Sequence, residues 1–397
     1  MTKWIKIKCL ETKNRQYLKK NKWVSAEKET EDIALLRLDA IGDFVIWLDS
    51  AQEYRKLFPK ARIVLICNKC NEIIAEKLNM FDEVISVSMN RFSVEDAYKK
   101  EIEKGFKSLY FKTLIQSAYS RTIEMDILAA MIPADEKIAM EADESKNNLS
   151  RFIVRKSTKK MADAVYSRLI VSDNKQRMEL NRNADFVRRL GRADFKAGIF
   201  HLPVMEDQVE LPKGEYFLVF PGASSQKKRW AIDNFAYIIR DVLEKTEYYG
   251  LVCGDNNEKD IAREVIKKSG ADKAERLINK AGKTTLLELI EYIRNAAFVI
   301  ANDTGGVHFA VATETPCVCI AGEQNKGRFL PYLPEKKENN KCFPIICSAG
   351  MKCAGCTYTK RDWRCLWNIV KKKHFLCVEK VEIAVVERAI QSILNKD

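Results

Sequence analysis

The sequence has few of the features that mark the common classes of protein. No run approaches the roughly 18 consecutive apolar residues of a membrane-spanning helix. The basic N-terminus, MTKWIKIKCLETKNRQYLKKNKW, has no continuous apolar segment and no small-residue cleavage site, so we predict no signal peptide. We therefore expect a soluble cytoplasmic protein, in which the 12 cysteines are thiols or metal ligands rather than disulfides.

Three familiar motifs for nucleotides and metals are also missing. No Gly-x-Gly-x-x-Gly follows a predicted strand, which argues against an oxidoreductase with two dinucleotide-binding domains. The segment AGKTT resembles the end of a P-loop, but Leu277 stands where the first glycine should be. No two aspartates are two residues apart, so the Asp-x-Asp pattern of metal-dependent sugar transferases is absent.

Positive charge is in clear excess. The chain has 68 Lys and Arg against 55 Asp and Glu, a net charge of +13. This excess favours an anionic partner: a nucleic acid, a nucleotide, a phosphorylated glycan or a membrane surface. The basic residues are spread along the chain, which argues against a dedicated nucleic-acid-binding face.

Short apolar runs alternate with segments of helical periodicity, twice along the chain. This alternation predicts an α/β protein with two parallel sheets, and the length suits two domains. Residues 90–195 are less regular and mostly helical in pattern, with a possible strand at residues 169–173. The predicted strands are 33–38, 61–67, 83–88, 216–220, 249–254, 297–301 and 316–322. The predicted divisions are a basic arm (1–30), a first domain (31–205), a second domain (215–380) with a Cys-rich segment (342–377), and a C-terminal helix (380–397).

The stretch NDTGGVHFAVATETPCVCIAG, residues 302–322, places a strand-to-helix turn at the carboxyl edge of the second sheet, where open α/β folds bind ligands. Gly305 and Gly306 are expected to take positive φ angles and to let a ligand approach. The helix N-terminus then suits a pyrophosphate. The alternative is an ordinary helix cap made by Asp303 and Thr304. His308 is expected to be a core histidine behind this turn.

Two further turns follow predicted strands. In RLDAIGDF, Asp43 could act as a general base. The alternative is that it caps a helix and has no catalytic role. In FPGASSQKKRW, the hydroxyls of Ser224 and Ser225 precede Lys228, a combination that suits phosphate oxygens. A solvated basic loop is the alternative reading of that segment.

Four cysteines near the C-terminus form a candidate metal site. Cys353 and Cys356 make a Cys-x-x-Cys pair, and Cys365 and Cys377 follow it. Four thiolates can close a tetrahedral structural site for zinc or iron. The alternative is four ordinary thiols. Such a closed site leaves no open position for substrate, so its metal would be structural and would take no part in catalysis.

Taken together, LLRLDAIGDFVIW, FPGASSQKKRWAIDNFA, LVCGDNNEKDIA and ANDTGGVHFAVATETPCVCIAG resemble glycosyltransferase family 9, the ADP-heptose:lipopolysaccharide heptosyltransferases. The resemblance covers most of the chain and is weakest over residues 90–200. It implies a GT-B fold, two Rossmann-like domains facing each other across a cleft. It also implies metal-independent, inverting transfer from a nucleotide-diphosphate sugar.

The resemblance also implies roles for individual residues. Asp43 matches the catalytic base, and the donor-binding positions are Ser224, Ser225, Lys228, Glu258, Asp303, Thr304, Gly305 and Gly306. The expected function is transfer of a sugar, heptose from ADP-heptose, to a lipopolysaccharide-type or other anionic glycan or glycolipid, with peripheral contact at the inner membrane. The alternatives are a protein acceptor, or a zinc-ribbon protein that binds nucleic acid.

Overall fold

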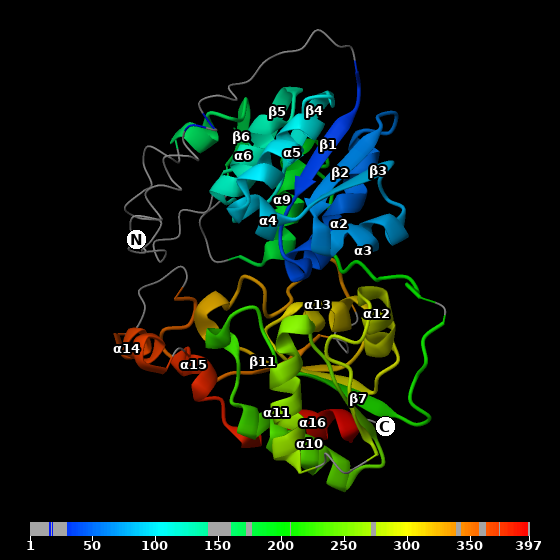
Figure 1. Ribbon diagram of the computed structural model, residues 1–397, viewed down its shortest axis with the longest axis vertical. Coiled ribbons are helices and arrows are strands. Elements are labelled where there is room, and N and C mark those ends of the chain that lie inside the picture. Colours follow the sequence, from blue (N-terminus) through cyan, green and yellow to red (C-terminus); the bar gives the residue numbers. More distant parts are fainter. Residues whose placement is uncertain are drawn as a thin grey trace. The chain divides into compact units, whose positions relative to one another are not determined.

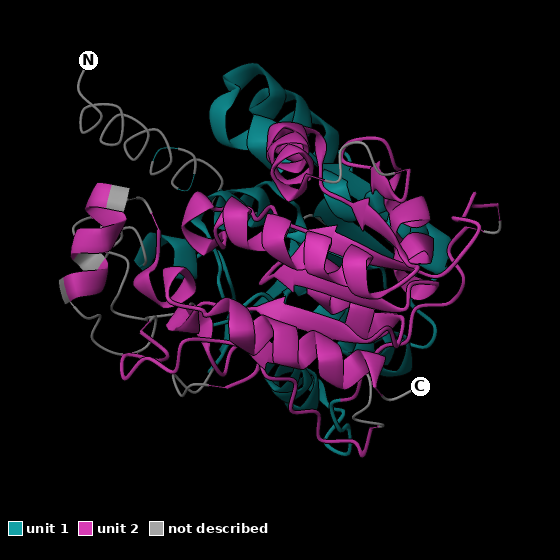
Figure 2. Ribbon diagram, turned by 90° about the horizontal axis from the view of Figure 1, so that it is seen from below, with its two compact units in different colours: residues 1–175, 180–197 teal, residues 176–179, 198–397 magenta. Residues whose placement is uncertain are grey.

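The structure is a computed structural model of the 397-residue chain. It describes Gln16, Leu18 and residues 30–141, 160–171, 177–206, 208–270, 275–338, 343–356, 363–372 and 374–395. The predicted basic arm therefore lies almost entirely outside the described residues. The chain divides into two compact units, Met1–Lys175 with Leu180–Ala197, and Gln176–Glu179 with Gly198–Asp397 (Figure 2).

The first unit is built on a six-stranded parallel sheet with the order β3-β2-β1-β4-β5-β6 (Figure 1). Its strands are β1 (Ile33–Arg37), β2 (Ile63–Asn68), β3 (Glu83–Val87), β4 (Phe111–Gln116), β5 (Ala134–Met140) and β6 (Arg168–Ile170). Its helices are α2 (Ile41–Leu57), α3 (Glu72–Leu78), α4 (Met89–Val94), α5 (Asp96–Phe106), α6 (Ile123–Met131) and most of α9 (Glu179–Leu190).

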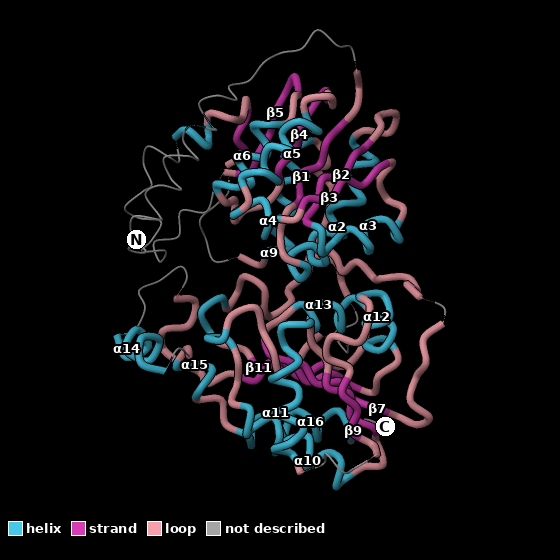
Figure 3. The backbone as a smooth tube through the Cα atoms, viewed as in Figure 1, coloured by secondary structure: helices cyan, strands magenta, loops and turns pink. Residues whose placement is uncertain are grey.

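The second unit repeats this plan with the order β12-β11-β10-β7-β8-β9, again all parallel. Its strands are β7 (Tyr216–Phe220), β8 (Tyr249–Val252), β9 (Leu277–Asn279), β10 (Phe298–Asn302), β11 (Cys317–Ile320) and β12 (Ile345–Cys347). Its helices are α10 (Ile232–Lys245), α11 (Lys259–Ser269), α12 (Leu286–Arg294), α13 (Gly305–Ala312), α14 (Trp363–Lys372), α15 (Leu376–Glu379) and α16 (Ile383–Leu394). Helices cover both faces of this sheet (Figures 2 and 3).

The predicted class, α/β with two parallel sheets, is confirmed. Every residue of β1 and of β7 is buried, and these strands lie at the centres of their sheets. A central strand covered on both faces is apolar throughout, which is why the sequence showed these strands as continuous apolar runs. In both units the strand order reverses beside the first strand, between β1 and β4 and between β7 and β10. Such a reversal opens a crevice at the carboxyl ends of the strands, where ligands bind.

The helical pattern of residues 90–195 and the possible strand at 169–173, which overlaps β6, agree with the structure, but β4 and β5 were not predicted. Three charged residues, Asp135, Glu136 and Lys137, interrupt the apolar pattern of β5. The Lys137 side chain is nevertheless buried, and its ammonium donates to the carbonyl of Ala129 at 2.7 Å. Burial lowers the pKa of Lys137 to about 8. The hydrogen bond that makes this burial tolerable depends on the tertiary fold and leaves no mark in the sequence.

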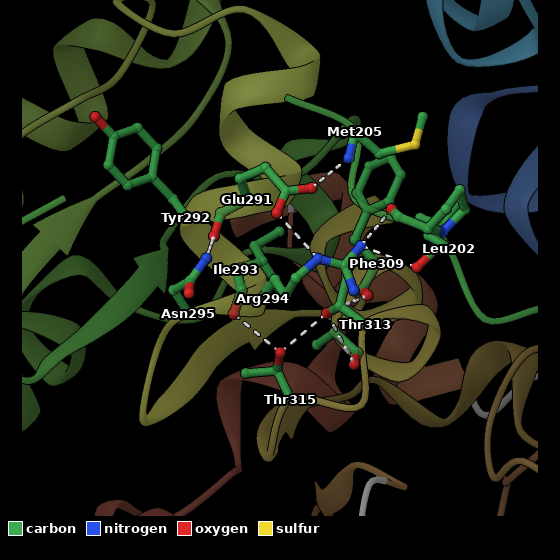
Figure 4. A network of polar contacts seen from close by, with 12 residues as sticks. Leu202, Met205, Glu291, Tyr292, Ile293, Arg294, Asn295, Phe309, Thr313 and Thr315 are labelled. Carbon is green, nitrogen blue, oxygen red and sulfur yellow. Dashed lines mark hydrogen bonds and ion pairs between the residues drawn. The ribbon is translucent and has the colours of Figure 1, made fainter. Parts of the chain in front are cut away.

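The segment that enters the second unit is anchored to α12 and α13 by a polar network (Figure 4). Arg294 donates to the carbonyls of Leu202 and Pro203 at 2.9 and 2.6 Å and pairs with Glu291 at 3.0 Å. Glu291 in turn accepts the backbone N–H of Met205 at 2.7 Å. These contacts fix an irregular segment against α12, and the Leu202 N–H, which donates to the Ala312 carbonyl at 2.8 Å, fixes it against α13.

Candidate functional site

The carboxyl ends of β7 and β10 are joined by one buried side chain. Asn302, the last residue of β10, is completely buried. Its amide donates to the carbonyls of Pro221 and Gly222 at 2.8 and 3.1 Å, and its oxygen accepts the Trp230 N–H at 3.0 Å. The loop after β7 and the turn after β10 are therefore held together at the point where the strand order reverses.

Two of the predicted donor-binding residues meet directly at this point. Lys228 Nζ lies 3.0 Å from Asp303 Oδ2, although the two residues are 75 positions apart in the chain. The Lys228 side chain is 21% exposed and that of Asp303 is 8% exposed, so the lysine keeps a solvent-facing side. A partly exposed ammonium held beside a carboxylate can bind an anion while it stays paired with that carboxylate.

The residue after Asp303 caps α13 without using its side chain. Thr304 is the N-cap, and its hydroxyl oxygen is buried without a hydrogen-bond partner among the described residues. The first N–H groups of a helix have no partner within the helix, and the helix dipole makes this end positive. A hydroxyl and backbone N–H groups in this arrangement suit an anionic ligand oxygen.

The expectation of positive φ angles at the paired glycines was wrong. Gly305 and Gly306 are the first two residues of α13, and neither has a positive φ angle. A methyl group at Gly306 would instead lie 3.2 Å from ring carbons of Phe220, at the end of β7. Close packing of the helix on the neighbouring strand therefore favours glycine at position 306.

The loop after β7 also contacts Glu258. A methyl group at Gly222 would lie only 2.0 Å from Glu258 Oε1, so any side chain there would displace the carboxylate. Glu258 Oε2 accepts the Asp255 N–H at 3.1 Å in a capping box. Burial raises the pKa of Glu258, while the nearby Arg229 acts in the opposite direction. Arg229 itself donates twice to the Ala223 carbonyl, at 3.1 and 2.8 Å.

The two predicted serines contribute less to this arrangement. Ser224 is exposed, and Ser225 is partly buried. The Ser225 carbonyl accepts the Lys228 N–H at 2.9 Å, which closes the turn that presents the lysine.

His308 is buried behind the turn, as expected. Its Nδ1 lies 2.7 Å from the Tyr332 hydroxyl. Burial lowers the pKa of His308 to about 4; Asp303 opposes this shift and Lys228 adds to it. The imidazole is therefore neutral at pH 7 and serves to pack the helix rather than to transfer protons.

This pKa predicts a pH-dependent stability. Because the folded-state pKa of His308 lies below the unfolded value, its contribution is present above about pH 6.5 and lost as the pH falls toward 4. Glutamine can still bond Tyr332 but does not titrate. Between pH 7 and pH 4 we therefore expect the free energy of unfolding of His308→Gln to fall by about 2–3 kcal/mol less than that of the wild type. Urea unfolding of both proteins at each pH measures this, and equal pH dependence would contradict it.

Asp43, the predicted base, lies in the first turn of α2 in the first unit and is partly buried. The turn before it is fixed to the sheet. Arg37, at the end of β1, is completely buried and pairs with Asp39 at 2.7 Å. Asn71 donates to the Asp39 carbonyl at 3.0 Å. Asp43 is thus presented on a rigid turn at the β1–β4 reversal.

The four candidate metal ligands, Cys353, Cys356, Cys365 and Cys377, all lie in the second unit. Burial raises the pKa of Cys377 to about 11; the Glu323 N–H, which donates to Cys377 Sγ at 3.3 Å, acts in the opposite direction, and the thiols of Cys365, Cys356 and Cys353 raise the pKa further. These thiols are the donor set that zinc or iron takes. Within the described parts of the chain, however, no three His, Cys, Asp or Glu side chains are arranged as metal ligands.

Comparison with known proteins identifies the family. The profile of glycosyltransferase family 9 (heptosyltransferase) matches residues 111–353, more than half of the chain. The chain belongs to glycosyltransferase family 9. Family membership makes it a transferase enzyme and confirms the resemblance drawn from the four motifs.

Relatives of this glycosyltransferase agree with that assignment. The lipopolysaccharide core heptosyltransferase OpsX of Haemophilus influenzae is 21% identical over 315 residues, 76% of this chain and 82% of that protein. Lipooligosaccharide heptosyltransferase 2 of the same organism is 28% identical over 117 residues, 29% of this chain and only 33% of that protein.

Solved structures share the fold. A glycosyltransferase family 9 protein from Veillonella parvula matches with a TM-score of 0.70 and 16% identity, covering 94% of this chain and all of that one. The dodecameric iron-containing heptosyltransferase TibC of enterotoxigenic E. coli, solved with ADP-D-β-D-heptose, matches with a TM-score of 0.51 and 14% identity over 94% of this chain and 79% of that one. The fold of the glycosyltransferase is therefore of the GT-B class.

Two residues important for the geometry of the glycosyltransferase were not predicted. Asn302 joins the two loops, and its place as the last residue of an apolar strand, just before Asp303, was the only signal available. Arg37 is a charge inside an apolar run, which indicates a partnered buried group. None of the described helices is long and apolar enough to cross a membrane.

Proposed function

We propose that this family 9 enzyme transfers heptose from ADP-heptose to a lipopolysaccharide-type glycan or glycolipid. The observation that carries the proposal is the Lys228–Asp303 pair beside the N-terminus of α13 and the unpartnered Thr304 hydroxyl. Cation, hydroxyl and helix N-terminus together offer the contacts that a diphosphate needs. The names of the heptosyltransferase relatives supply the donor and acceptor classes.

In the proposed reaction, Asp43 accepts the proton of an acceptor hydroxyl. That oxygen attacks the anomeric carbon of the donor sugar while the bond from this carbon to the diphosphate oxygen breaks, so the configuration inverts. Lys228, Thr304 and the N–H groups of Gly305 and Gly306 stabilise the charge that develops on the departing ADP. Asp303 orients a sugar hydroxyl, and Ser224, Ser225 and Glu258 complete the donor site. No metal takes part in this chemistry.

The acceptor is proposed to be anionic, because the chain carries a net charge of +13. If the acceptor is linked to a lipid, the enzyme acts at the cytoplasmic face of the inner membrane and contacts that membrane peripherally. Nucleic acid is not a proposed partner, since a family 9 fold accounts for both units.

The test of this function is a transfer assay with several nucleotide sugars. Purified protein is titrated with ADP-heptose, UDP-sugars and a mixed oligonucleotide, and transfer is then followed on a truncated lipopolysaccharide acceptor. We expect saturable binding of ADP-heptose and inverted product. Tight binding of the oligonucleotide without nucleotide-sugar binding would contradict the proposal. Transfer to a polypeptide but not to the glycan would show that the acceptor is a protein.

We further propose a structural zinc or iron held by Cys353, Cys356, Cys365 and Cys377. The electrostatic influence of the other three thiols on Cys377 supports it, and the iron-containing fold relative makes iron an alternative to zinc. Such a metal would stabilise the segment that carries these cysteines, because binding energy at a thiolate site is folding energy.

Elemental analysis of protein purified without a metal-affinity step tests this site. We expect about one metal per chain, lost in Cys356→Ser together with a lower melting temperature. Activity should fall only as a consequence of that lower stability, since Asp43 and the donor loop lie in other segments. Cys70→Ser, at an exposed cysteine of the first unit, is the control and should keep the metal. A metal-free wild type that is folded and active would leave the four cysteines as ordinary thiols.

A further inference from the structure

A pocket opens beside Asp303 that the donor contacts described so far do not account for. Asp303, Gly322 and Ser348 line it from the carboxyl ends of β10, β11 and β12, and the loop that follows β11 completes its wall. Lys228 and Glu258 are not among the residues that line it. The pocket therefore extends the site beyond the phosphate contacts.

One carboxylate in this pocket has an unused acceptor. Glu323 is only 3% exposed. Its Oε1 accepts the Met351 N–H at 3.0 Å, whereas Oε2 is buried without a hydrogen-bond partner among the described residues. Lys326 Nζ lies 4.0 Å from Oε2, too far for a hydrogen bond. A buried carboxylate oxygen that accepts no hydrogen bond is costly, so a ligand group that donated to it would be favoured.

The Cys-rich segment holds Glu323 in place. Its backbone N–H donates to Cys377 Sγ at 3.3 Å, and its carbonyl accepts the Gly355 N–H at 2.7 Å. The Met351 contact adds a third hydrogen bond, so the backbone N–H, the carbonyl and the side chain of Glu323 all bond to residues 28 or more positions away. A side chain fixed in this way is preorganised for recognition.

We propose that this pocket holds the transferred sugar and that Glu323 accepts a hydrogen bond from one of its hydroxyls, which makes it a specificity-determining residue. The inference rests on the proposed function. Two carboxylates, Asp303 and Glu323, line the pocket together with one cation, Lys326. This excess of negative charge disfavours a phosphate, whereas sugar hydroxyls can donate to carboxylates. Apolar side chains supply the surface against which the C–H groups of a sugar pack; they are Phe329, Leu330, Pro331 and Ile346.

The test compares ADP with ADP-heptose in Glu323→Gln. Glutamine can keep the Met351 contact through its oxygen, and it then presents an NH₂ donor where the carboxylate presented an acceptor. We expect the Kd for ADP to stay within about twofold and the Kd for ADP-heptose to rise roughly 10- to 100-fold. Glu264→Gln, an exposed glutamate of α11, is the matched control and should change neither.

A set of ADP-sugars that each lack one hydroxyl identifies the contact. Wild type should bind one member of the set poorly, and Glu323→Gln should bind that member and the parent sugar equally. Glu323→Asp, which keeps the charge but shortens the side chain, should lose less than the glutamine variant.

The outcomes separate the two proposals. Unchanged ADP-heptose binding in Glu323→Gln, with wild type binding normally, overturns the sugar contact alone. An equal loss for ADP and ADP-heptose shows that the pocket takes the nucleoside, and also overturns it. Wild-type protein that binds neither ligand contradicts the proposed function, and the inference with it.

Discussion

Asp43→Asn is expected to lower the transfer rate roughly 10²- to 10⁴-fold, the contribution typical of a general base. The amide is nearly isosteric but cannot take the proton of the acceptor hydroxyl. Donor binding should stay within a few fold, because the proposed donor contacts all belong to the second unit. Transfer to a lipopolysaccharide acceptor and the Kd for ADP measure the two effects separately.

Asp96→Asn is the matched control for this variant. Asp96 also lies in the first turn of a helix, α5, but it is exposed. Both substitutions remove a negative charge from a helix N-terminus, a change of typically 0.3–1 kcal/mol in stability. Only Asp43→Asn should lose activity. Near-wild-type turnover in Asp43→Asn would remove this residue from the mechanism.

Lys228→Ala is expected to weaken ADP binding roughly 10- to 100-fold, the value of one or more charge-assisted hydrogen bonds. The loss has two parts, because the variant removes a cation and also leaves the Asp303 carboxylate without its partner near the phosphates. Thr304→Val should weaken ADP less, since the N–H groups at the start of α13 remain. Isothermal titration with ADP measures each variant.

The double variant Lys228→Ala with Asp303→Asn separates the two parts. If repulsion by the unpaired Asp303 contributes, the second substitution should restore some of the lost affinity. Lys227→Ala is the neighbouring control and should bind ADP normally, since no contact of its ammonium to the turn is present in the described structure. ADP affinity equal to wild type in both Lys228→Ala and Thr304→Val would mean that the diphosphate binds elsewhere.

Much of the fold could be predicted from local pattern. The strands β1, β7 and β10 are continuous apolar runs, because central strands of a parallel sheet are buried on both faces. The turns after them are short and polar, so the sequence alone placed Asp43 and Asp303 at sheet edges. Strand β5 could not be found in the same way, because the partner that makes Lys137 tolerable is a carbonyl in α6.

The sequence by itself therefore determined the fold class, the family and the edge of each sheet at which polar residues collect, since all of these depend on neighbouring residues and on ordered motifs. Tertiary structure alone decided which of those residues meet. Strand order sets Lys228 against Asp303 across 75 positions, and packing against Phe220 explains Gly306. The position of Glu323 is set by contacts with Met351 and Cys377, which lie 28 and 54 positions further along the chain. Contacts of this kind depend on long-range packing, which no local pattern records.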